Sequence, residues 1–209
     1  MEYVQIKEPQ AIYEEMRRII VFDFDKTLTY KDSLRELFLQ EMKGVMYPLR
    51  LLYFGLTILS KIGVIPVRME KELMIRTLFH NDNEMFAQKC REQARHIKLN
   101  SLFNLLKDHI ATDNRVIIIS ASSTYILNEV FKGMNVEIIG TTFLCDSGKI
   151  IKIERHPFYK EKLDSLIQYG VTEVDELYYD SSKDECLIPL CKKWNKVRNG
   201  LIIKTESSK

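Results

Sequence analysis

Short runs of consecutive apolar residues alternate with segments of helical periodicity along most of this chain. Ile19–Phe22 is the first such run, and Arg115–Ile119, Val136–Gly140 and Glu176–Tyr179 follow it. Strands that are apolar at nearly every position are typical of parallel sheets that helices cover on both faces. The pattern therefore predicts an α/β fold with three layers.

Helical periodicity runs from Asp32 to about Ile97, with breaks near Gly44, Gly63–Pro66 and His80–Asn83. Because it interrupts the chain after the first strand, this segment predicts a small helical cap domain at residues 33–100. Residues 1–32 and 101–209 then form the core domain. Further expected elements are helices at Pro9–Arg18, Leu102–Ile110, Ser123 to Lys132, Pro157–Tyr169 and Asp184–Lys192, and a hairpin at Phe143–Ile153 that turns at Asp146-Ser147-Gly148.

Polar residues stand where the apolar runs end. Asp23 and Asp25 follow the first run, Ser120 the second and Asp180 the last, with Asp184 one helical turn later. The carboxyl ends of parallel strands meet at one edge of a sheet, where ligands bind. Carboxylates two apart in an extended segment point the same way, and they persist side by side when a cation lies near them. Oxygen ligands of this kind suit Mg²⁺, so the sequence predicts a magnesium site at this edge.

Candidate anion ligands accompany these acids. Lys162 supplies a positive charge, the Ser120 hydroxyl is a donor, and the helix expected after Ser120 offers free backbone amides at its first turn. A helix cap is the structural alternative for Ser120, and it is compatible with anion binding. Magnesium together with these donors could neutralise a phosphate ester before an anionic nucleophile approaches it.

Four motifs, in order, resemble those of the haloacid dehalogenase-like superfamily. They are Phe22–Thr29 (DxDxT), Ile118–Ser122, Glu161-Lys162-Leu163 with Leu166, and Tyr179–Asp184 (DSxxD). The chain is thereby identified as a subfamily IB type member, similar to phosphoserine phosphatases and phosphatidylglycerophosphatases. The resemblance implies a Rossmann-like core with a cap inserted after the first strand, and a magnesium-dependent phosphatase.

The resemblance also implies roles for individual residues. Asp23 would be the nucleophile that forms an aspartyl-phosphate, and Asp25 the general acid and base. Phosphate would be bound by Thr27, Ser120, Ala121 and Lys162, and the metal by Asp23, Asp25, Asp180 and Asp184. Lys162 is preferred to the nearby Lys160 because its spacing to Leu166 fits the family pattern. Lys26, where a small residue is common, is either solvated or adds positive charge to the site.

The cap is expected to select the substrate. Residues 42–69 contain no acid, but Lys43, Arg50, Lys61 and Arg68 interrupt an apolar sequence. Within it, Gly44–Pro66 resembles the cap of phosphatidylglycerophosphatases, whereas no counterpart of the phosphoserine phosphatase glutamate and arginine stands out. Either the cap contacts a lipid phosphate and a membrane surface, or its apolar face packs on itself or on a second subunit. A small-molecule phosphatase, a phosphotransferase and a non-catalytic module on the same fold are the alternative functions.

Composition narrows the setting. The 209 residues are 45% hydrophobic, with a net charge of +2 and a pI near 8.2, which is too mild to indicate a nucleic-acid partner. The longest uncharged run near the centre of residues 42–69, Leu51–Ser60, is too short to span a bilayer. The N-terminal residues are not expected to be a secretory signal, because acids come early and no apolar run follows. The four cysteines show no metal-ligand spacing and are expected to be reduced core residues. A cytoplasmic protein, or one peripheral at the inner face of the membrane, is expected. The four histidines are expected to be surface or partly buried residues without metal ligation.

Overall fold

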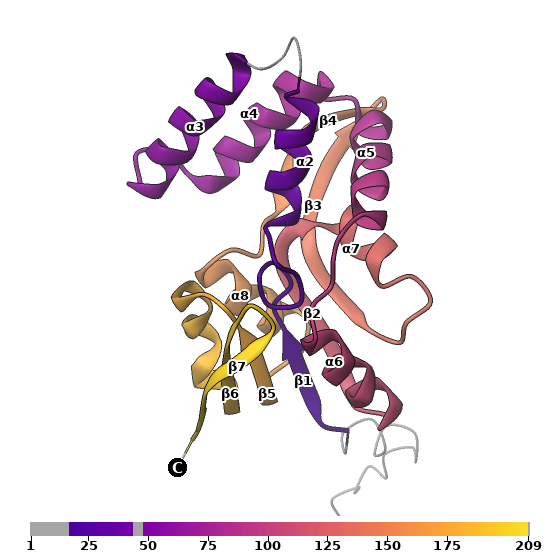
Figure 1. The fold of residues 1–209 in the computed structure, drawn as a ribbon, viewed down its shortest axis with the longest axis vertical. Helices are drawn as coiled ribbons and strands as arrows, with labels where there is room; N and C mark the ends of the chain where they lie inside the picture. The colour runs from indigo at the N-terminus through magenta and orange to yellow at the C-terminus, as the bar shows by residue number, and fades with distance from the viewer. Residues whose placement is uncertain (1–16, 44–47, 209) are drawn as a thin grey trace, which may run out of the picture.

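The computed structural model describes residues 17–43 and 48–208, so most of the helix expected at Pro9–Arg18 lies outside the described residues. The elements alternate between strands and helices and carry a helical segment above the sheet (Figure 1). In chain order they are β1 (Ile19–Phe22), α2 (Ser33–Glu41), α3 (Pro48–Lys61), α4 (Val67–Phe79), α5 (Asn83–Arg95), α6 (Leu102–Ala111), β2 (Arg115–Ser123), α7 (Thr124–Val130), β3 (Glu137–Asp146), β4 (Lys149–Arg155), α8 (Lys160–Gln168), β5 (Val174–Tyr179), the 3-10 helix η2 (Ser182–Leu190), β6 (Cys191–Arg198) and β7 (Leu201–Ser207).

The strands of the described residues form one seven-stranded sheet in the order β4-β3-β2-β1-β5-β6-β7. The pairs β1–β2, β1–β5, β2–β3 and β5–β6 are parallel, and the outer pairs β3–β4 and β6–β7 are antiparallel. The predicted parallel sheet is confirmed. β1 lies at its centre, so the residues that follow Phe22 emerge between two parallel neighbours.

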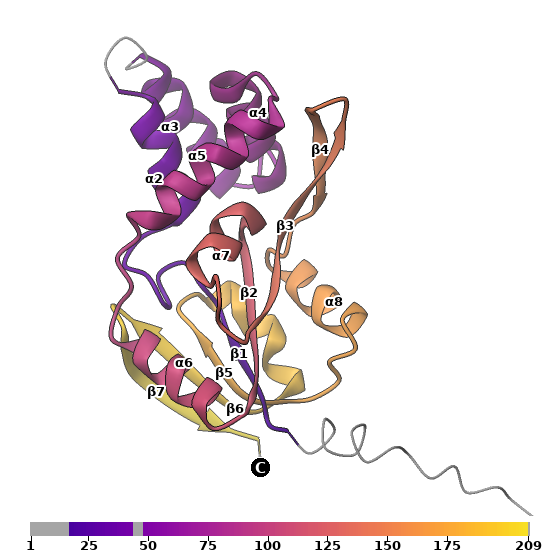
Figure 2. The ribbon, with the colours of Figure 1, turned by 90° about the vertical axis from the view of Figure 1, so that its right-hand side faces the viewer.

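Successive residues of the central strands enter two different cores. Ile20 and Phe22 pack with α6 and α7 on one face, and Val21 packs with α8 and η2 on the other (Figure 2). Both faces are therefore covered, which is why these strands are apolar at almost every position. This confirms the three-layer prediction.

Helices α2 to α5 stand over the carboxyl ends of the parallel strands (Figure 1). The predicted β3–β4 hairpin rises beside them and bonds to them directly. The Asn83 amide donates to the Gly148 carbonyl at 3.0 Å, and the Ile150 amide donates to the Asn81 carbonyl at 2.7 Å. The cap is thus attached to the core by this hairpin as well as by its own two ends.

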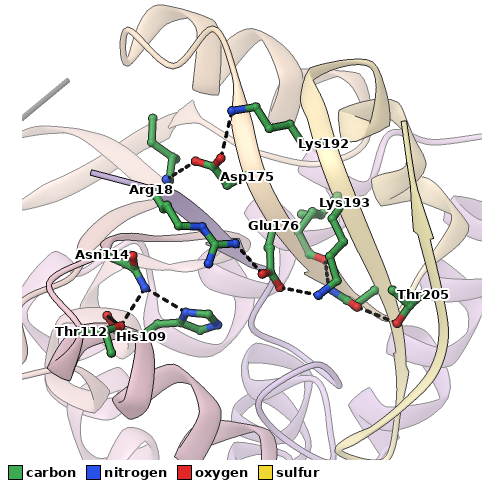
Figure 3. A network of polar contacts seen from close by, with 12 residues as sticks. Arg18, His109, Thr112, Asn114, Asp175, Glu176, Lys192, Lys193 and Thr205 are labelled. Atoms are coloured by element: carbon green, nitrogen blue, oxygen red, sulfur yellow. Dashed lines mark hydrogen bonds and ion pairs between the residues drawn. The ribbon is translucent and has the colours of Figure 1, made fainter. Parts of the chain in front are cut away.

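The amino ends of the strands carry an ion-pair network (Figure 3). The Glu176 carboxylate accepts from the Arg18 guanidinium at 2.6 Å and from the Lys193 ammonium at 3.2 Å. Burial alone would raise the pKa of Glu176, but hydrogen bonds from Tyr178, Arg18 and Lys193 lower it. The network holds β1, β5 and β6 together at the end of the sheet away from the cap.

Three local interpretations of the sequence are wrong. Ser120 does not cap a helix, because β2 continues to Ser123 and the Ser123 hydroxyl accepts from the Tyr125 amide instead. The helix expected at Asp184–Lys192 is the 3-10 helix η2, and Pro189 inside it cannot donate an α-helical hydrogen bond. His156 is buried, not superficial.

Other differences concern parts of the chain with weaker patterns. The antiparallel pair β6–β7 was not predicted, although Asn199-Gly200 between its strands is a strong hairpin signal. Among the cysteines, Cys90 and Cys191 are buried as expected, but Cys145 is exposed.

Candidate active site

The site begins in the loop that follows β1. The Asp23 amide continues the sheet by donating to the Tyr178 carbonyl at 2.9 Å, and the chain then turns back, with the Leu28 amide donating to the Phe24 carbonyl. Lys26 adopts a left-handed conformation at φ 62°, which is uncommon for a residue with a side chain. Backbone of this kind is concentrated at functional sites, where the surrounding structure maintains it.

Asn100, at the point where the cap returns to the core, holds this loop from behind. Its buried amide group donates to the Thr27 carbonyl at 2.8 Å and to the Thr29 carbonyl at 3.2 Å. Gly200 packs against it, and a Cβ at Gly200 would lie only 2.8 Å from the Asn100 side chain. The unpredicted β6–β7 turn therefore supports the loop that positions Asp23.

Three carboxylates and one lysine form the centre of the site. Oxygen atoms of Asp23, Asp180 and Asp184 lie within 4.8 Å of one another, although the three residues come from two different parts of the chain. The Lys162 ammonium is 2.7 Å from Asp23 Oδ1 and 2.6 Å from Asp184 Oδ1, and its side chain is buried. Burial opposes the charged form of Lys162, but the two carboxylates raise its pKa.

One lysine does not balance three acids. Burial and the neighbouring carboxylates raise the pKa of Asp180 to about 7 and that of Asp184 to about 6. These shifts mark excess negative charge at a group of oxygen ligands, which a divalent cation would relieve. The residues present therefore fit Mg²⁺, with Asp23, Asp180 and Asp184 as the side chains that would hold it.

The Asp25 carboxylate stands apart from this cluster. Its Oδ1 accepts from the Ser33 amide at 2.8 Å, at the start of the cap, and the described acid cluster does not include it. The expectation that Asp25 holds the metal therefore has no support from its side chain. Burial, with Asp32 and Asp23 nearby, raises the pKa of Asp25 to about 8, which favours its protonated form near neutral pH.

The remaining predicted residues surround the same point. Thr27 Oγ1 donates to Asp23 Oδ2 at 3.0 Å, so it orients the carboxylate in addition to shaping the loop. Ser120 and Ala121 line the pocket from the end of β2, and the Ser120 hydroxyl accepts from the Ser122 amide at 3.1 Å. Lys160 is exposed, so Lys162 is the lysine that reaches the site.

A pocket of about 320 Å³ opens from these residues toward the cap. Its core wall contains the acids, and its cap wall contains side chains of α2, α3 and α4. The cap residues that line it include Arg35, Phe38, Tyr53, Thr57, Glu70 and Lys71. The site therefore lies between the two predicted domains, and the cap supplies much of the wall opposite Asp23.

Sequence reasoning missed the charged residues of this cap wall. The Lys71 ammonium donates to the Ala121 carbonyl at 2.6 Å and so ties α4 to the predicted phosphate-binding segment. Burial lowers the pKa of Lys71, which Asp32 and Asp25 partly oppose. Arg35 and Glu70 also line the pocket, but they lie on different helices, and no fixed spacing relates them in the sequence.

A family comparison decides the identity of the fold. The model of the haloacid dehalogenase-like hydrolases matches residues 20–184, a span that contains all eight predicted site residues. The chain belongs to the haloacid dehalogenase-like hydrolase family. This confirms the resemblance that the four motifs indicated, and it makes the protein a hydrolase. No curated protein sequence matches the chain.

Solved structures of similar fold include phosphoserine phosphatase-like members of this family. A protein with unknown function from Bordetella pertussis Tohama I is 19% identical with a TM-score of 0.71, the match covering 83% of this chain and 86% of the other. A phosphoserine phosphohydrolase-like protein from Francisella tularensis is 18% identical with a TM-score of 0.63, covering 86% of both chains. A phospho-aspartyl intermediate analogue of phosphoserine phosphatase is 15% identical with a TM-score of 0.59, covering 86% of both chains. These likenesses confirm the predicted fold.

Proposed function

We propose that this hydrolase is a magnesium-dependent phosphatase that cleaves phosphomonoesters through an aspartyl-phosphate on Asp23. The observation that carries the proposal is the buried cluster in which Lys162 bridges Asp23 and Asp184 while Asp180 stands beside them. Such a site can hold a cation and a phosphate next to a fixed carboxylate nucleophile. Bound Mg²⁺ would neutralise phosphate charge and so permit an anionic nucleophile to approach.

The first half-reaction transfers the phosphoryl group to the protein. Asp23 Oδ attacks phosphorus, an Asp23–phosphorus bond forms, and the ester bond between phosphorus and the leaving oxygen breaks. Asp25, protonated at neutral pH by its raised pKa, donates its proton to that oxygen. Lys162 and the Thr27 hydroxyl keep the Asp23 carboxylate oriented for this attack.

The second half-reaction returns the protein to its starting state. Asp25, now a carboxylate, takes a proton from water, and the water oxygen attacks phosphorus. The Asp23–phosphorus bond breaks and inorganic phosphate leaves. One Asp25 residue thus serves as acid and then as base, with no net change in the protein.

The leaving group occupies the cap side of the pocket, and two substrate classes suit it. We favour a lipid phosphate such as phosphatidylglycerophosphate, because Lys61 and Lys71 on this wall would bind a second phosphate of the headgroup. A small zwitterionic ester such as phosphoserine is the alternative, supported by the opposite charges of Arg35 and Glu70 on the same wall. A phosphotransferase would use the same intermediate with an acceptor other than water.

A phosphate-release screen separates these functions. Purified protein with Mg²⁺ is tested on p-nitrophenyl phosphate, phosphoserine, sugar phosphates, nucleotides and phosphatidylglycerophosphate, each with and without EDTA. We expect release that EDTA abolishes, with phosphatidylglycerophosphate the best substrate. A higher kcat/KM for phosphoserine than for phosphatidylglycerophosphate would assign the small ester as the substrate class. Phosphate that appears on an added alcohol would indicate a phosphotransferase. Release that is unaffected by EDTA would overturn the magnesium dependence.

A further inference from the structure

Helix α3 faces the pocket with its polar side chains and the solvent with its apolar ones. Tyr53, Thr57 and Ser60 lie three to four residues apart and line the pocket. The opposite side carries Leu51, Leu52, Phe54, Ile58, Leu59 and, just beyond the helix, Ile62, all exposed. We call this side the outer face of α3. A helix of a globular protein ordinarily buries such a stripe.

The exposure is too large for scattered surface residues. Leu51 is 75% exposed, Ile58 59% and Ile62 67%, and Val64 continues the surface at 62% in the turn that follows. These residues are contiguous along one helix face, at helical spacing. Contiguous exposed apolar surface of this kind marks an interaction site.

The charges around the outer face indicate its partner. Residues 42–69 include four cations and no acid, and Lys43 and Lys61, near the two ends of α3, are both exposed. The nearby Glu70 is buried and accepts a hydrogen bond from Thr57, so its charge does not lie on this surface. Arg68 pairs with Glu161 and Arg50 donates to the Leu39 carbonyl, so Lys43 and Lys61 are the exposed cations of this segment. An apolar surface with exposed cations beside it matches the acyl boundary and the anionic headgroups of a membrane.

We propose that the outer face of α3 docks this protein on an anionic lipid surface. The helix has 14 residues, which is about 21 Å at 1.5 Å per residue, against a hydrocarbon thickness of about 30 Å. Over residues 17–43 and 48–208, no helix combines the length and hydropathy needed to cross a bilayer. α3 therefore lies in the plane of the interface, with its apolar side chains in the acyl boundary.

Docking in this orientation places the pocket at the lipid surface. Because the same helix lines the pocket with its inner side, burying the outer face brings the cap wall next to the headgroup layer. This goes beyond the proposed function, since the docking holds whether the pocket takes a lipid or a soluble ester. A second copy of the chain is the competing occupant, but two such faces would bring their exposed cations together.

Vesicle flotation tests the proposal with the full-length protein. Wild type is compared with Leu51→Gln/Ile58→Gln/Ile62→Gln, which removes apolar side chains outside the pocket and keeps a good helix former at the two positions within α3. Ile151→Thr/Leu201→Thr/Ile203→Thr is the matched control, since it changes three exposed apolar residues on β4 and β7. Vesicles of phosphatidylcholine with phosphatidylglycerol, and of phosphatidylcholine alone, are the probes.

We expect wild type and control to float with the anionic vesicles and the α3 variant to lose at least about tenfold in bound fraction. Flotation should weaken in high salt and with phosphatidylcholine alone. Wild type that does not float, or an α3 variant that floats equally well, would overturn the proposal. Light scattering that shows a wild-type dimer and a monomeric α3 variant, without flotation, would assign the face to a second copy.

The hydrolysis of p-nitrophenyl phosphate is measured in the same preparations. The α3 variant should keep the wild-type rate with this soluble ester, which shows that it is folded. If wild type hydrolyses this ester but does not float, the membrane-docking proposal is contradicted and the proposed phosphatase function stands. If wild type floats but does not hydrolyse it, the proposed phosphatase function is contradicted and the docking proposal stands.

Discussion

Charged side chains gather at both ends of the sheet, and the two clusters balance their charges differently. At the amino ends, Asp175 and Glu176 meet three cations, Arg18, Lys192 and Lys193 (Figure 3). The pKa of Glu176 is lowered there, so the carboxylate is stabilised in its charged form. This cluster is complete without any ligand.

At the carboxyl ends, Asp23 and Asp184 share the ammonium of Lys162, and Asp180 lies beside them near the charges of Lys26 and Lys162. The pKa values of Asp180 and Asp184 are raised, so their charged forms are destabilised in the absence of a cation. A buried cluster of acids is therefore a candidate ligand-binding site when nearby cations do not balance its negative charge. Balanced ion pairs in the same fold are structural.

The largest expected effect is on the nucleophile. Asp23→Asn should lower the rate of phosphate release by at least about a thousandfold, because the attacking carboxylate is lost. The fold should remain, since the substitution is nearly isosteric and removes one of three crowded charges. Circular dichroism and phosphate release measure the two effects.

Glu176→Gln at the other end of the sheet is the control for this variant. It should change kcat by less than about twofold while it lowers the free energy of unfolding by roughly 1–3 kcal/mol, because charged hydrogen bonds are lost. If Glu176→Gln lost as much activity as Asp23→Asn, the claim that the first cluster is structural and the second catalytic would be contradicted.

A smaller loss is expected when the lysine is removed. Lys162→Met should lower kcat by about 100- to 1000-fold, because a charge that orients Asp23, and that is proposed to contact the phosphate, disappears. Lys160→Met, two residues away and exposed, should stay close to wild type. A Lys160 variant as impaired as the Lys162 variant would contradict the assignment.

The metal prediction comes next in size. Asp180→Asn should raise the Mg²⁺ concentration for half-maximal activity by at least about tenfold, since a ligand oxygen of the cluster becomes neutral. Mg²⁺ titration of phosphate release measures this. An unchanged midpoint would mean that Asp180 does not hold the cation.

The smallest effect concerns pH and stability without metal. The pKa values of Asp180 and Asp184 are higher in the folded than in the unfolded chain. At a pH between the ordinary pKa of an aspartate and its raised value, the folded state therefore binds more protons than the unfolded state. Metal-free wild type should therefore lose stability as the pH rises from about 4 to about 7, relative to Asp180→Asn, and the loss should level off above that range. A difference of 1 kcal/mol corresponds to about 2–4 °C in Tm for a protein of this size.

Comparing wild type with Asp180→Asn cancels the contribution of other titratable groups to the pH dependence of stability. Burial lowers the pKa of His156, so this residue acts in the opposite direction, but equally in both proteins. Saturating Mg²⁺ should flatten the difference, and Glu176→Gln should not alter it, since the lowered pKa of Glu176 places its titration at lower pH. A wild type that gains stability over this pH range, relative to the variant, would contradict the prediction.

Much of the core was predictable because its signals are local. Strands buried on both faces must be apolar throughout, so β1, β2 and β5 stand out, and the acids that follow β1 and β5 break that pattern abruptly. The β6–β7 pair was missed because Lys192, Lys193 and Lys196 interrupt its apolar residues, and the Asn199-Gly200 turn was the remaining signal. Lysines on both faces of β6 hide the alternation that would mark a strand.

The cap wall could not be predicted in the same way. Arg35, Glu70 and Lys71 come together only when α2 and α4 pack over the sheet, and the sequence contains no spacing rule for that packing. The predicted boundary at residue 100 separates the cap from the core along the chain. In the structure, however, the β3–β4 hairpin of the core hydrogen-bonds directly to the cap. A helix cap at Ser120 was a possible prediction because the four small residues 120–123 do not show where the strand ends and the helix begins.

The proposed aspartyl-phosphate is tested directly with Asp25→Asn and p-nitrophenyl phosphate. The nitrophenolate leaves without a proton, so Asp23 is still phosphorylated, but the variant has no base to activate water. We predict a burst of about one nitrophenolate per site, slow turnover afterwards, and phosphate on the peptide that contains Asp23 after acid quench. Full turnover without a burst, or a labelled peptide that excludes Asp23, would contradict the mechanism.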